Sequence, residues 1–295
     1  MSKIPQALPG LLACVISILM SNGAVAADNN IVVVGGEGAD CIEDPGCVNR
    51  LHPDIPMAAR ARPGQTILFR TRDARDVLGA AAAQTTEPDS LNGDFGHVHP
   101  ITGPVYIEGA VAGDVLKVTL NNIDPGPYAW TMGGSSGFIS DLVDGQSLVI
   151  WRLNRIYAES DDLPGIRIPN GSFPGVITTM PGPNQLRVML EREQALADAG
   201  GRVSLPMANG ADPAALCGPN GSARDQCLRT LPPREHGGNM DIRYLKTGVS
   251  IYLPCFIDGC GLAIGDLHYA QGDGEVSGTA IEMSADVWVT TEILK

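Results

Sequence analysis

The segment GDLHYAQGDGEVSGTAIE, residues 265–282, places four carboxylates, one imidazole and four glycines close together near the C-terminus. The apolar residues between them favour buried strands, so we expect the segment to be partly buried and its carboxylates to need partners. If the chain is extended there, Asp266 and His268 project to the same face. Such a pair suits a divalent cation, and zinc is the natural candidate for mixed imidazole and carboxylate ligands.

A second polar stretch, REHGGNMD at residues 234–241, contains His236, Asn239 and Asp241 around a pair of glycines. The glycines allow unusual backbone torsions, so the three side chains could face a common centre. An ordinary hydrogen-bonded turn has the same composition. Both interpretations stay open for this segment taken alone.

A third stretch, FGHVHPITGPVYIEGA, contains His97, His99 and Glu108. We expect His97 on the surface and His99 in a turn before proline, with metal binding as the alternative. Glu108 is expected inside an apolar strand, where a carboxylate is paired, bound to metal or held at a raised pKa as a general base. Together the three stretches favour metal-assisted hydrolysis, in which a carboxylate accepts the proton of a bound water.

The N-terminus predicts export. Residues 1–26 have one cation, an apolar run and a small-x-small motif, which are typical of a cleaved signal peptide. The remaining six cysteines form three close pairs in the sequence, Cys41–Cys47, Cys217–Cys227 and Cys255–Cys260, and we favour these as disulfides among the fifteen pairings that six cysteines allow. We therefore expect a periplasmic or secreted protein.

The charge of the chain limits its partners. The full sequence has a net charge of −13, and loss of Lys3 with the signal peptide would make it −14. An acidic surface repels phosphate backbones and anionic lipids, so we expect neither nucleic acid nor stable membrane association. A small neutral ligand is the expected partner, and a homo-oligomer is left open.

Glycine and proline account for 58 residues (36 and 22), which is typical of a chain with many turns. We predict a mainly β fold with some α/β elements, and treat residues 27–295 as one catalytic unit. The pattern of β-branched residues predicts strands at 66–71, 105–108, 115–120, 147–152, 248–253 and 287–291. One helix is predicted from Asn184 to Ala199, with Asn184 as its cap and Gly200 as its end.

Four motifs resemble the acetamidase/formamidase family, and they span most of the chain: NRLHPDIP (49–56), HPITGPVYIEGAVAGDVLKV (99–118), HGGNMDIRYLKTGVSIYLP (236–254) and the segment 265–282. The resemblance implies a β-sandwich-like fold of the family's own type and a divalent metal, with zinc as our choice. It also implies hydrolysis of a small carboxamide, such as formamide or acetamide, to carboxylate and ammonia. Some relatives look like lactam hydrolases.

The resemblance also implies site residues. The matched positions predict Asp241, Asp266 and His268 as metal ligands. Glu108 and Glu275 are the predicted catalytic carboxylates, Glu108 as general base and Glu275 as a carboxylate that orients an imidazole. Asn239, Gln271 and His236 are predicted to bind the substrate. The alternatives are a lactam hydrolase, a catalytically inactive exported binding protein of the same fold and, ranked below both, a copper protein of cupredoxin type.

Overall fold

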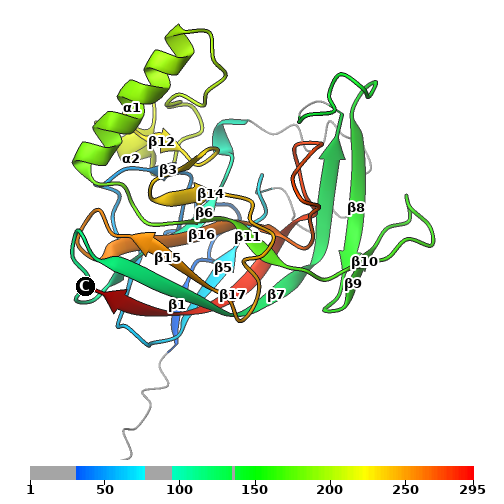
Figure 1. Cartoon of the computed structure of the whole chain (residues 1–295), viewed down its shortest axis with the longest axis horizontal. Coiled ribbons are helices and arrows are strands. Elements are labelled where there is room, and N and C mark those ends of the chain that lie inside the picture. Colours follow the sequence, from blue (N-terminus) through cyan, green and yellow to red (C-terminus); the bar gives the residue numbers. More distant parts are fainter. Residues whose placement is uncertain (1–30, 77–94, 135–136) are drawn as a thin grey trace, which may run out of the picture.

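The computed structural model describes residues 31–76, 95–134 and 137–295, so the predicted signal peptide at 1–26 lies outside the described residues. The described chain is mainly β, as predicted, with two short segments of α-helix (Figure 1). The longer strands are β5 (Ile67–Thr71), β6 (Ile101–Ile107), β7 (Val115–Gly133), β8 (Ser147–Leu153), β11 (Phe173–Thr178), β15 (Ser250–Pro254), β16 (Cys260–His268) and β17 (Glu282–Leu294).

Short strands extend the edges of this structure. They are β1 (Val32–Val34), β2 (Cys47–Val48), β3 (Arg50–Leu51), β4 (Ala59–Ala61), β9 (Tyr157–Glu159), β10 (Ile168–Pro169), β12 (Leu228–Arg229), β13 (Pro233–Arg234) and β14 (Gly237–Asn239). One large sheet has the order β10-β9-β8-β7-β17-β16-β11-β14-β13, with the other strands branching from this path except β3 and β12, which pair separately. Pairing is antiparallel apart from β1 with β5 and β4 with β6.

Strand β16 lies at the centre of the sheet and carries the functional residues. All nine of its residues are buried, and it pairs with β6, β11 and β17. Its apolar run is continuous rather than alternating, which is the pattern of a strand covered on both faces. A polar residue at the end of such a strand is therefore held rigidly inside the protein.

The predicted strands all overlap observed strands, but the central strand β16, strand β11 and much of β7 were missed. Strand β7 continues to Gly133, well beyond the predicted end at residue 120. Strand β11 was not predicted, although all six of its residues are buried. Its composition is the reason, because two of its first three residues are proline and glycine, which weaken a strand signal.

The predicted helix is present as α1 (Pro183–Asp198), and a second helix, α2 (Ala214–Cys217), was not predicted. The predicted cap was wrong: Gly182 occupies the N-cap position without a side-chain hydrogen bond, and Pro183 begins the helix. Proline suits this first position because its missing N–H would have no partner in the helix. Gly200 ends the helical region with a φ of +82°.

The structure joins the cysteines as predicted. Disulfides connect Cys41 with Cys47, Cys217 with Cys227, and Cys255 with Cys260, with Cα–Cα distances of 5.2, 5.6 and 4.5 Å. Three disulfides fit an oxidising compartment. In the part of the chain that the structure describes, no helix is both long and apolar enough to cross a membrane.

Candidate active site

The polar end of β16 contains the imidazole around which the candidate site is built. The Nε2 atom of His268 lies 3.5 Å from Oδ2 of Asp266 and 3.3 Å from Oε2 of Glu282. All three residues are buried. Strand pairing explains the arrangement, because His268 lies directly opposite Glu282, the first residue of β17. The prediction that Asp266 and His268 lie close together is confirmed.

Two further carboxylates approach the same imidazole. Oε1 of Glu275, in the loop between β16 and β17, lies 3.6 Å from Nε2 of His268. Asp241 follows β14 and offers an oxygen within 4.8 Å of ligand atoms of His268 and Glu275. We refer to these five residues as the acidic centre: Asp241, Asp266, His268, Glu275 and Glu282.

Gly175 allows two of these carboxylates to meet. A Cβ atom at this position would lie 2.6 Å from Oδ2 of Asp266 and 2.8 Å from Oδ1 of Asp241, closer than real Cβ atoms come. The carbonyl oxygen of Gly175 also accepts hydrogen bonds from the backbone N–H groups of Met240 and Asp241. Gly175, in the unpredicted strand β11, therefore leaves the space in which the carboxylates of Asp241 and Asp266 lie.

The backbone is unusual at the same two acids. Asp266 has a φ of +53° and Asp241 a φ of +49°, a region that residues with a side chain seldom adopt. Such conformations persist only where the surrounding structure enforces them, and they concentrate at functional sites. At Asp266 the enforcing structure is the central strand itself.

Gln271 fixes the orientation of the imidazole. Its Oε1 lies 3.0 Å from Nδ1 of His268, while its Nε2 donates to the backbone carbonyl of Asp241 at 3.1 Å. Since the amide nitrogen is used by Asp241, Oε1 acts as an acceptor and Nδ1 of His268 carries the proton. The lone pair of Nε2 then points toward the carboxylates, as a metal ligand requires.

The other two predicted substrate-binding residues are buried but differently engaged. Nδ1 of His236 lies 2.7 Å from Oγ1 of Thr178, and burial lowers its pKa to about 3. Asn239 donates from Nδ2 to the carbonyl oxygen of Leu231, while its buried Oδ1 has no partner among the described residues. His236 is therefore neutral, and Asn239 keeps an acceptor available.

The carboxylates of the acidic centre hold different charges. Burial, together with Asp266, raises the pKa of Asp241 to about 7, and burial together with Glu282 raises the pKa of Glu275 to about 9. Burial would also raise the pKa of Asp266, but His99 and His268 outweigh it and hold that pKa at about 2. Burial would lower the pKa of His268, but Glu282 and Asp266 outweigh it and raise that pKa well above its usual value. Four carboxylates thus share one imidazole, which favours protons on Glu275 and Asp241.

The acidic centre also lacks hydrogen-bond partners. Four of its buried atoms make no hydrogen bond to another described residue: Oδ1 of Asp241, Nε2 of His268, Oε1 of Glu275 and Oε2 of Glu282. Buried polar groups in folded proteins are rarely left unpaired, and each such group calls for an explanation. The ligand atoms form two overlapping groups, Asp241 with His268 and Glu275, and Asp266 with His268 and Glu282, and in each group they lie within 4.8 Å of one another. Such donor sets fit a divalent cation.

His99 belongs to the site, although it was expected in a turn. Its Nε2 lies 3.9 Å from Oδ1 of Asp266, and its ring is buried. Burial lowers its pKa, which keeps the ring neutral. Sequence reasoning missed it because the neighbouring Pro100 indicates a turn, whereas the residue lies two positions before the start of β6, which pairs with the central strand. Glu282, matched to the family motif but given no role, is the other residue that was missed.

Glu108 does not join the acidic centre. Strand β6 ends at Ile107, so Glu108 lies just beyond it. Its side chain is 47% exposed and faces Arg60, with Oε1 4.0 Å from Nε. The expectation of a carboxylate buried in an apolar strand was wrong, because the strand ends one residue earlier than the apolar sequence suggested.

A pocket of about 170 Å³ opens onto the acidic centre, and we refer to it as the inner pocket. His99, Asp266, Glu275 and Glu282 form its polar end. Its other walls combine apolar side chains, among them Phe95, Val98, Trp130 and Leu231, with the charged Arg75 and the hydroxyl group of Thr279. The Nε1 atom of Trp130 donates to Oδ1 of buried Asp73 at 3.0 Å, which holds that wall in place.

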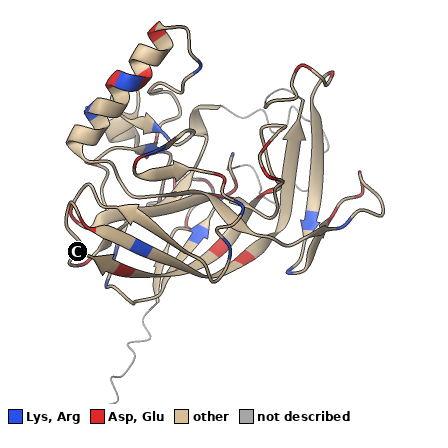
Figure 2. Ribbon diagram, in the orientation of Figure 1, with Lys and Arg blue, Asp and Glu red and all other residues tan. Residues whose placement is uncertain are grey.

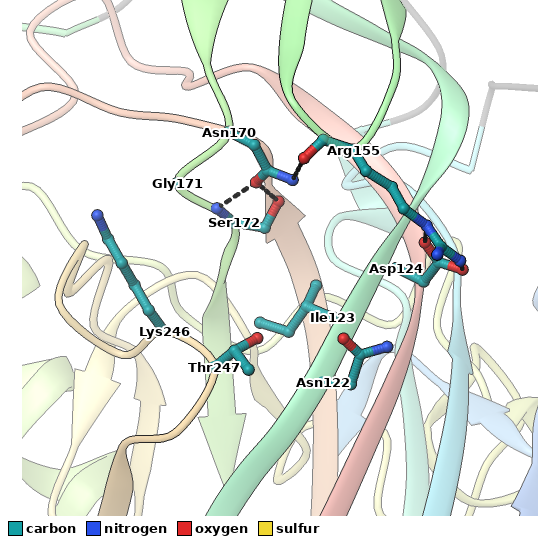
Figure 3. Close-up of a pocket in the computed structure, with 9 residues that line it drawn as sticks. All are labelled: Asn122, Ile123, Asp124, Arg155, Asn170, Gly171, Ser172, Lys246 and Thr247. Atoms are coloured by element: carbon teal, nitrogen blue, oxygen red, sulfur yellow. Dashed lines mark hydrogen bonds and ion pairs between the residues drawn. The ribbon is translucent and has the colours of Figure 1, made fainter.

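A more polar pocket of about 400 Å³ lies where β7 meets the segment before β11 (Figure 3). Its polar groups bind one another. Oδ1 of Asn170 accepts from the backbone N–H and the hydroxyl of Ser172, and Arg155 forms two hydrogen bonds with Asp124. It contains neither a histidine nor a cluster of carboxylates, so the inner pocket is the candidate active site.

Comparison with known proteins defines the class of protein. Residues 39–295 match the model of the Acetamidase/Formamidase family, and the chain belongs to this family. The family resemblance seen in the sequence is thereby confirmed, as is its mainly β fold.

Individual relatives support the same class. The chain is 33% identical to an acetamidase of Mycolicibacterium smegmatis over 84% of this chain and 66% of that protein. It is 32% identical to a formamidase of Methylophilus methylotrophus, over 84% of this chain and 64% of that protein. A solved structure of a gamma lactamase from Delftia acidovorans matches with a TM-score of 0.79 and 32% identity, over 86% of this chain and 65% of that one. The chain thus spans about two thirds of these relatives' length.

Proposed function

We propose that this protein is an exported, metal-dependent amidase that hydrolyses a carboxamide to a carboxylate and ammonia. The observation that carries the proposal is the set of buried carboxylate and imidazole atoms around His268 that make no hydrogen bond, two of which belong to Glu275 and Glu282 in the lining of the inner pocket. Family membership and relatives named acetamidase, formamidase and gamma lactamase support the same reaction. Residues 27–295 would form the mature catalytic unit, after cleavage of a signal peptide at 1–26.

We assign Asp241, Asp266 and His268 as metal ligands, and add Glu282 to the predicted set because it faces the same Nε2 atom at 3.3 Å. Mixed carboxylate and imidazole ligands favour zinc. A divalent metal bound there would polarise the amide carbonyl and lower the pKa of water. Gln271 keeps the imidazole in the tautomer that presents Nε2 to the ligand set.

Glu275 is the proposed proton carrier. It lies on a loop rather than on the central strands, lines the inner pocket and has a pKa raised to about 9 by burial and Glu282. A protonated carboxyl group at such a position can donate its proton to the leaving nitrogen, and the carboxylate then formed can accept a proton from water. His99, neutral and at the wall of the same pocket, is placed to hold the amide group. Glu108 has no role in this scheme.

The experiment is ammonia release from formamide, acetamide and propionamide by the purified mature protein, with metal content measured in parallel. Activity should fall after treatment with a chelator and return with zinc. A lactam tested alongside distinguishes linear from cyclic amides, a point raised by the gamma lactamase at 32% identity. A protein that binds metal stoichiometrically but hydrolyses no amide would instead be the inactive binding protein.

A further inference from the structure

A second and larger cavity adjoins the inner pocket. It has a volume of about 740 Å³ and lies beside the C-terminal part of α1; we refer to it as the outer cavity. Phe95 and Leu231 line both spaces. The two cavities therefore share a wall to which these two residues contribute.

The combined space is much larger than the smallest amides need. Formamide is little larger than one or two water molecules, and the share of one water in the liquid is about 30 Å³. The inner pocket alone has about 170 Å³. A site with this much room next to a shared wall suits a substrate that extends beyond its reacting amide.

Much of the outer cavity is apolar. Leu196 comes from α1, and Val203, Leu205 and Met207 come from the segment after it. These side chains are half-buried or exposed, so they present apolar surface to the cavity. Such a surface suits a hydrocarbon chain or a ring.

The charge of the outer cavity is opposite to that of the whole molecule. The chain has 33 acidic and 20 basic residues, yet the cavity is lined by three arginines and one glutamate (Figure 2 marks the charges on α1 and the nearby strands). Glu193 is neutralised by Arg234, whose Nε lies 2.6 Å from its carboxylate. Arg192 is likewise paired with Glu235.

Arg202 and Arg229 supply the remaining positive charge. Arg202 is exposed and forms no ion pair with any described residue. Arg229 lies over the ring of Phe95, 5.0 Å from its centroid, and donates to the carbonyl oxygen of the same residue. Positive charge is therefore found both at the shared wall and farther out.

We propose that the outer cavity is an extended substrate subsite, and that the natural substrate is an amide whose apolar chain ends in a carboxylate. This inference rests on the proposed amidase function. The amide enters the inner pocket, the chain passes the wall to which Phe95 and Leu231 contribute, and the carboxylate meets Arg202. Charge fixes this orientation, because Arg202 has no carboxylate partner among the described residues and attracts an anion, whereas Arg75, which lines the inner pocket, already faces Glu282 and Asp73.

The test compares monoamides of linear dicarboxylic acids, with increasing chain length, against neutral amides of the same length. For the wild-type protein we expect kcat/KM to be about tenfold higher for the best carboxylated amide than for its neutral counterpart, as one charge-assisted contact would give. The difference should shrink at high salt, because Arg202 is exposed.

Variants separate recognition from catalysis. Arg202→Gln should lower kcat/KM about tenfold for the carboxylated amide while changing that for the neutral amide less than twofold, and Arg202→Lys should retain most of the preference. Arg187→Gln is the matched control, since Arg187 lies on α1, is paired with Glu191 and does not line the cavity.

Two results would overturn the inference while leaving the amidase function intact. One is hydrolysis of acetamide without preference for any carboxylated amide, and the other is an equal loss for both substrates in Arg202→Gln. If no amide is hydrolysed, the amidase function fails, and calorimetric binding of suberate, a dicarboxylate, still tests the subsite. Binding that weakens about tenfold in Arg202→Gln would support the subsite, and absence of binding would reject it.

Discussion

Two buried carboxylates of this protein, those of Asp44 and Glu282, differ in their hydrogen-bond partners. Oδ2 of Asp44 accepts from the backbone N–H groups of Gly36 and Glu37 and lies 3.3 Å from Nη2 of Arg72, and its Oδ1 accepts from Gly46. Glu282 in the acidic centre is equally buried, but its Oε2 has no hydrogen-bond partner among the described residues. Burial of a carboxylate therefore does not identify a functional site, whereas an unpaired oxygen facing a cavity does.

The difference follows from what each carboxylate must stabilise. The carboxylate of Asp44 accepts its hydrogen bonds from neighbouring residues of the same loop region and from Arg72. It therefore stabilises the fold and needs no ligand. In the acidic centre four carboxylates share one imidazole and the nearby Arg75, so like charges lie close together. Such an arrangement costs stability unless a cation completes it, so it is informative about function.

The largest expected effect tests the acidic side of this comparison. Glu282→Gln should lower amidase activity on the order of 10³-fold, similar to the loss of a major electrostatic contributor in other enzymes. The metal-free protein should keep or raise its free energy of unfolding, because a disfavoured buried charge is removed. Steady-state kinetics and urea unfolding measure the two effects.

Glu292→Gln is the matched control, because Glu292 lies on the same strand but is exposed and paired with Lys117. Its activity should stay within about twofold, as expected for a surface ion pair. An active Glu282→Gln protein would remove Glu282 from the ligand set.

The next effect tests the role of Asp44 in stability. Asp44→Asn should lower the free energy of unfolding by about 1.5–3 kcal/mol, the usual range for hydrogen bonds to a charged group. Metal content and kcat/KM should remain near wild type. Glu37→Gln, at an exposed neighbouring position, is the control for the change of charge. Loss of activity without loss of stability in Asp44→Asn would contradict the division between the two regions.

Gly175 provides a test of geometry without any change of charge. Gly175→Ala should weaken metal binding about 10- to 100-fold, the size of effect seen when groups that position ligands are altered. The added methyl group would force Asp266 and Asp241 apart. Gly171→Ala is the control, since its methyl group would meet only the flexible end of Lys246 at 3.4 Å. Equal metal affinities in the two variants, measured by competition with a chelator, would refute this role.

The smallest effect concerns Asp212, a half-buried carboxyl group outside both regions. Burial raises its pKa from 3.8 to about 6. The folded protein thus binds this proton more tightly than the unfolded chain, so the stability contributed by Asp212 declines as the pH rises from about 4 to 6 and then stays constant. This decline should amount to less than about 1 kcal/mol, because water screens the half-buried group. The substitution Asp212→Asn should remove it. The free energies of unfolding of the wild type and of Asp212→Asn should be measured at pH 4, 5 and 7. The same dependence on pH in both proteins would contradict the assignment.

Much of the fold and of the site followed from local sequence. The β-branched runs predicted most of the long strands, although not β11 and β16, and the spacing of Asp266 and His268 indicated a ligand pair. The three disulfides also followed from sequence, because each closes a short loop. These features depend on residues that are near one another in the chain.

The rest depended on contacts between distant segments. Glu108 seemed buried because its neighbours are apolar, but the end of β6 leaves it at the surface beside Arg60. His99 seemed to be a turn residue, yet β6 pairs with β16 and brings its ring to Asp266. Neither position has a local signal, since burial depends on which strands become neighbours.

The sequence by itself determined the family, the mainly β class and the residue types available for hydrolysis. Only the tertiary structure decided which carboxylates meet, because pairing of β16 with β17 places Glu282 opposite His268, and Gly175 of β11 leaves room for Asp241 and Asp266. It also decided that several atoms of the acidic centre make no hydrogen bond, whereas both carboxylate oxygens of Asp44 accept hydrogen bonds. The physical reason is that hydrogen-bond satisfaction is a property of three-dimensional neighbours, which local sequence does not specify.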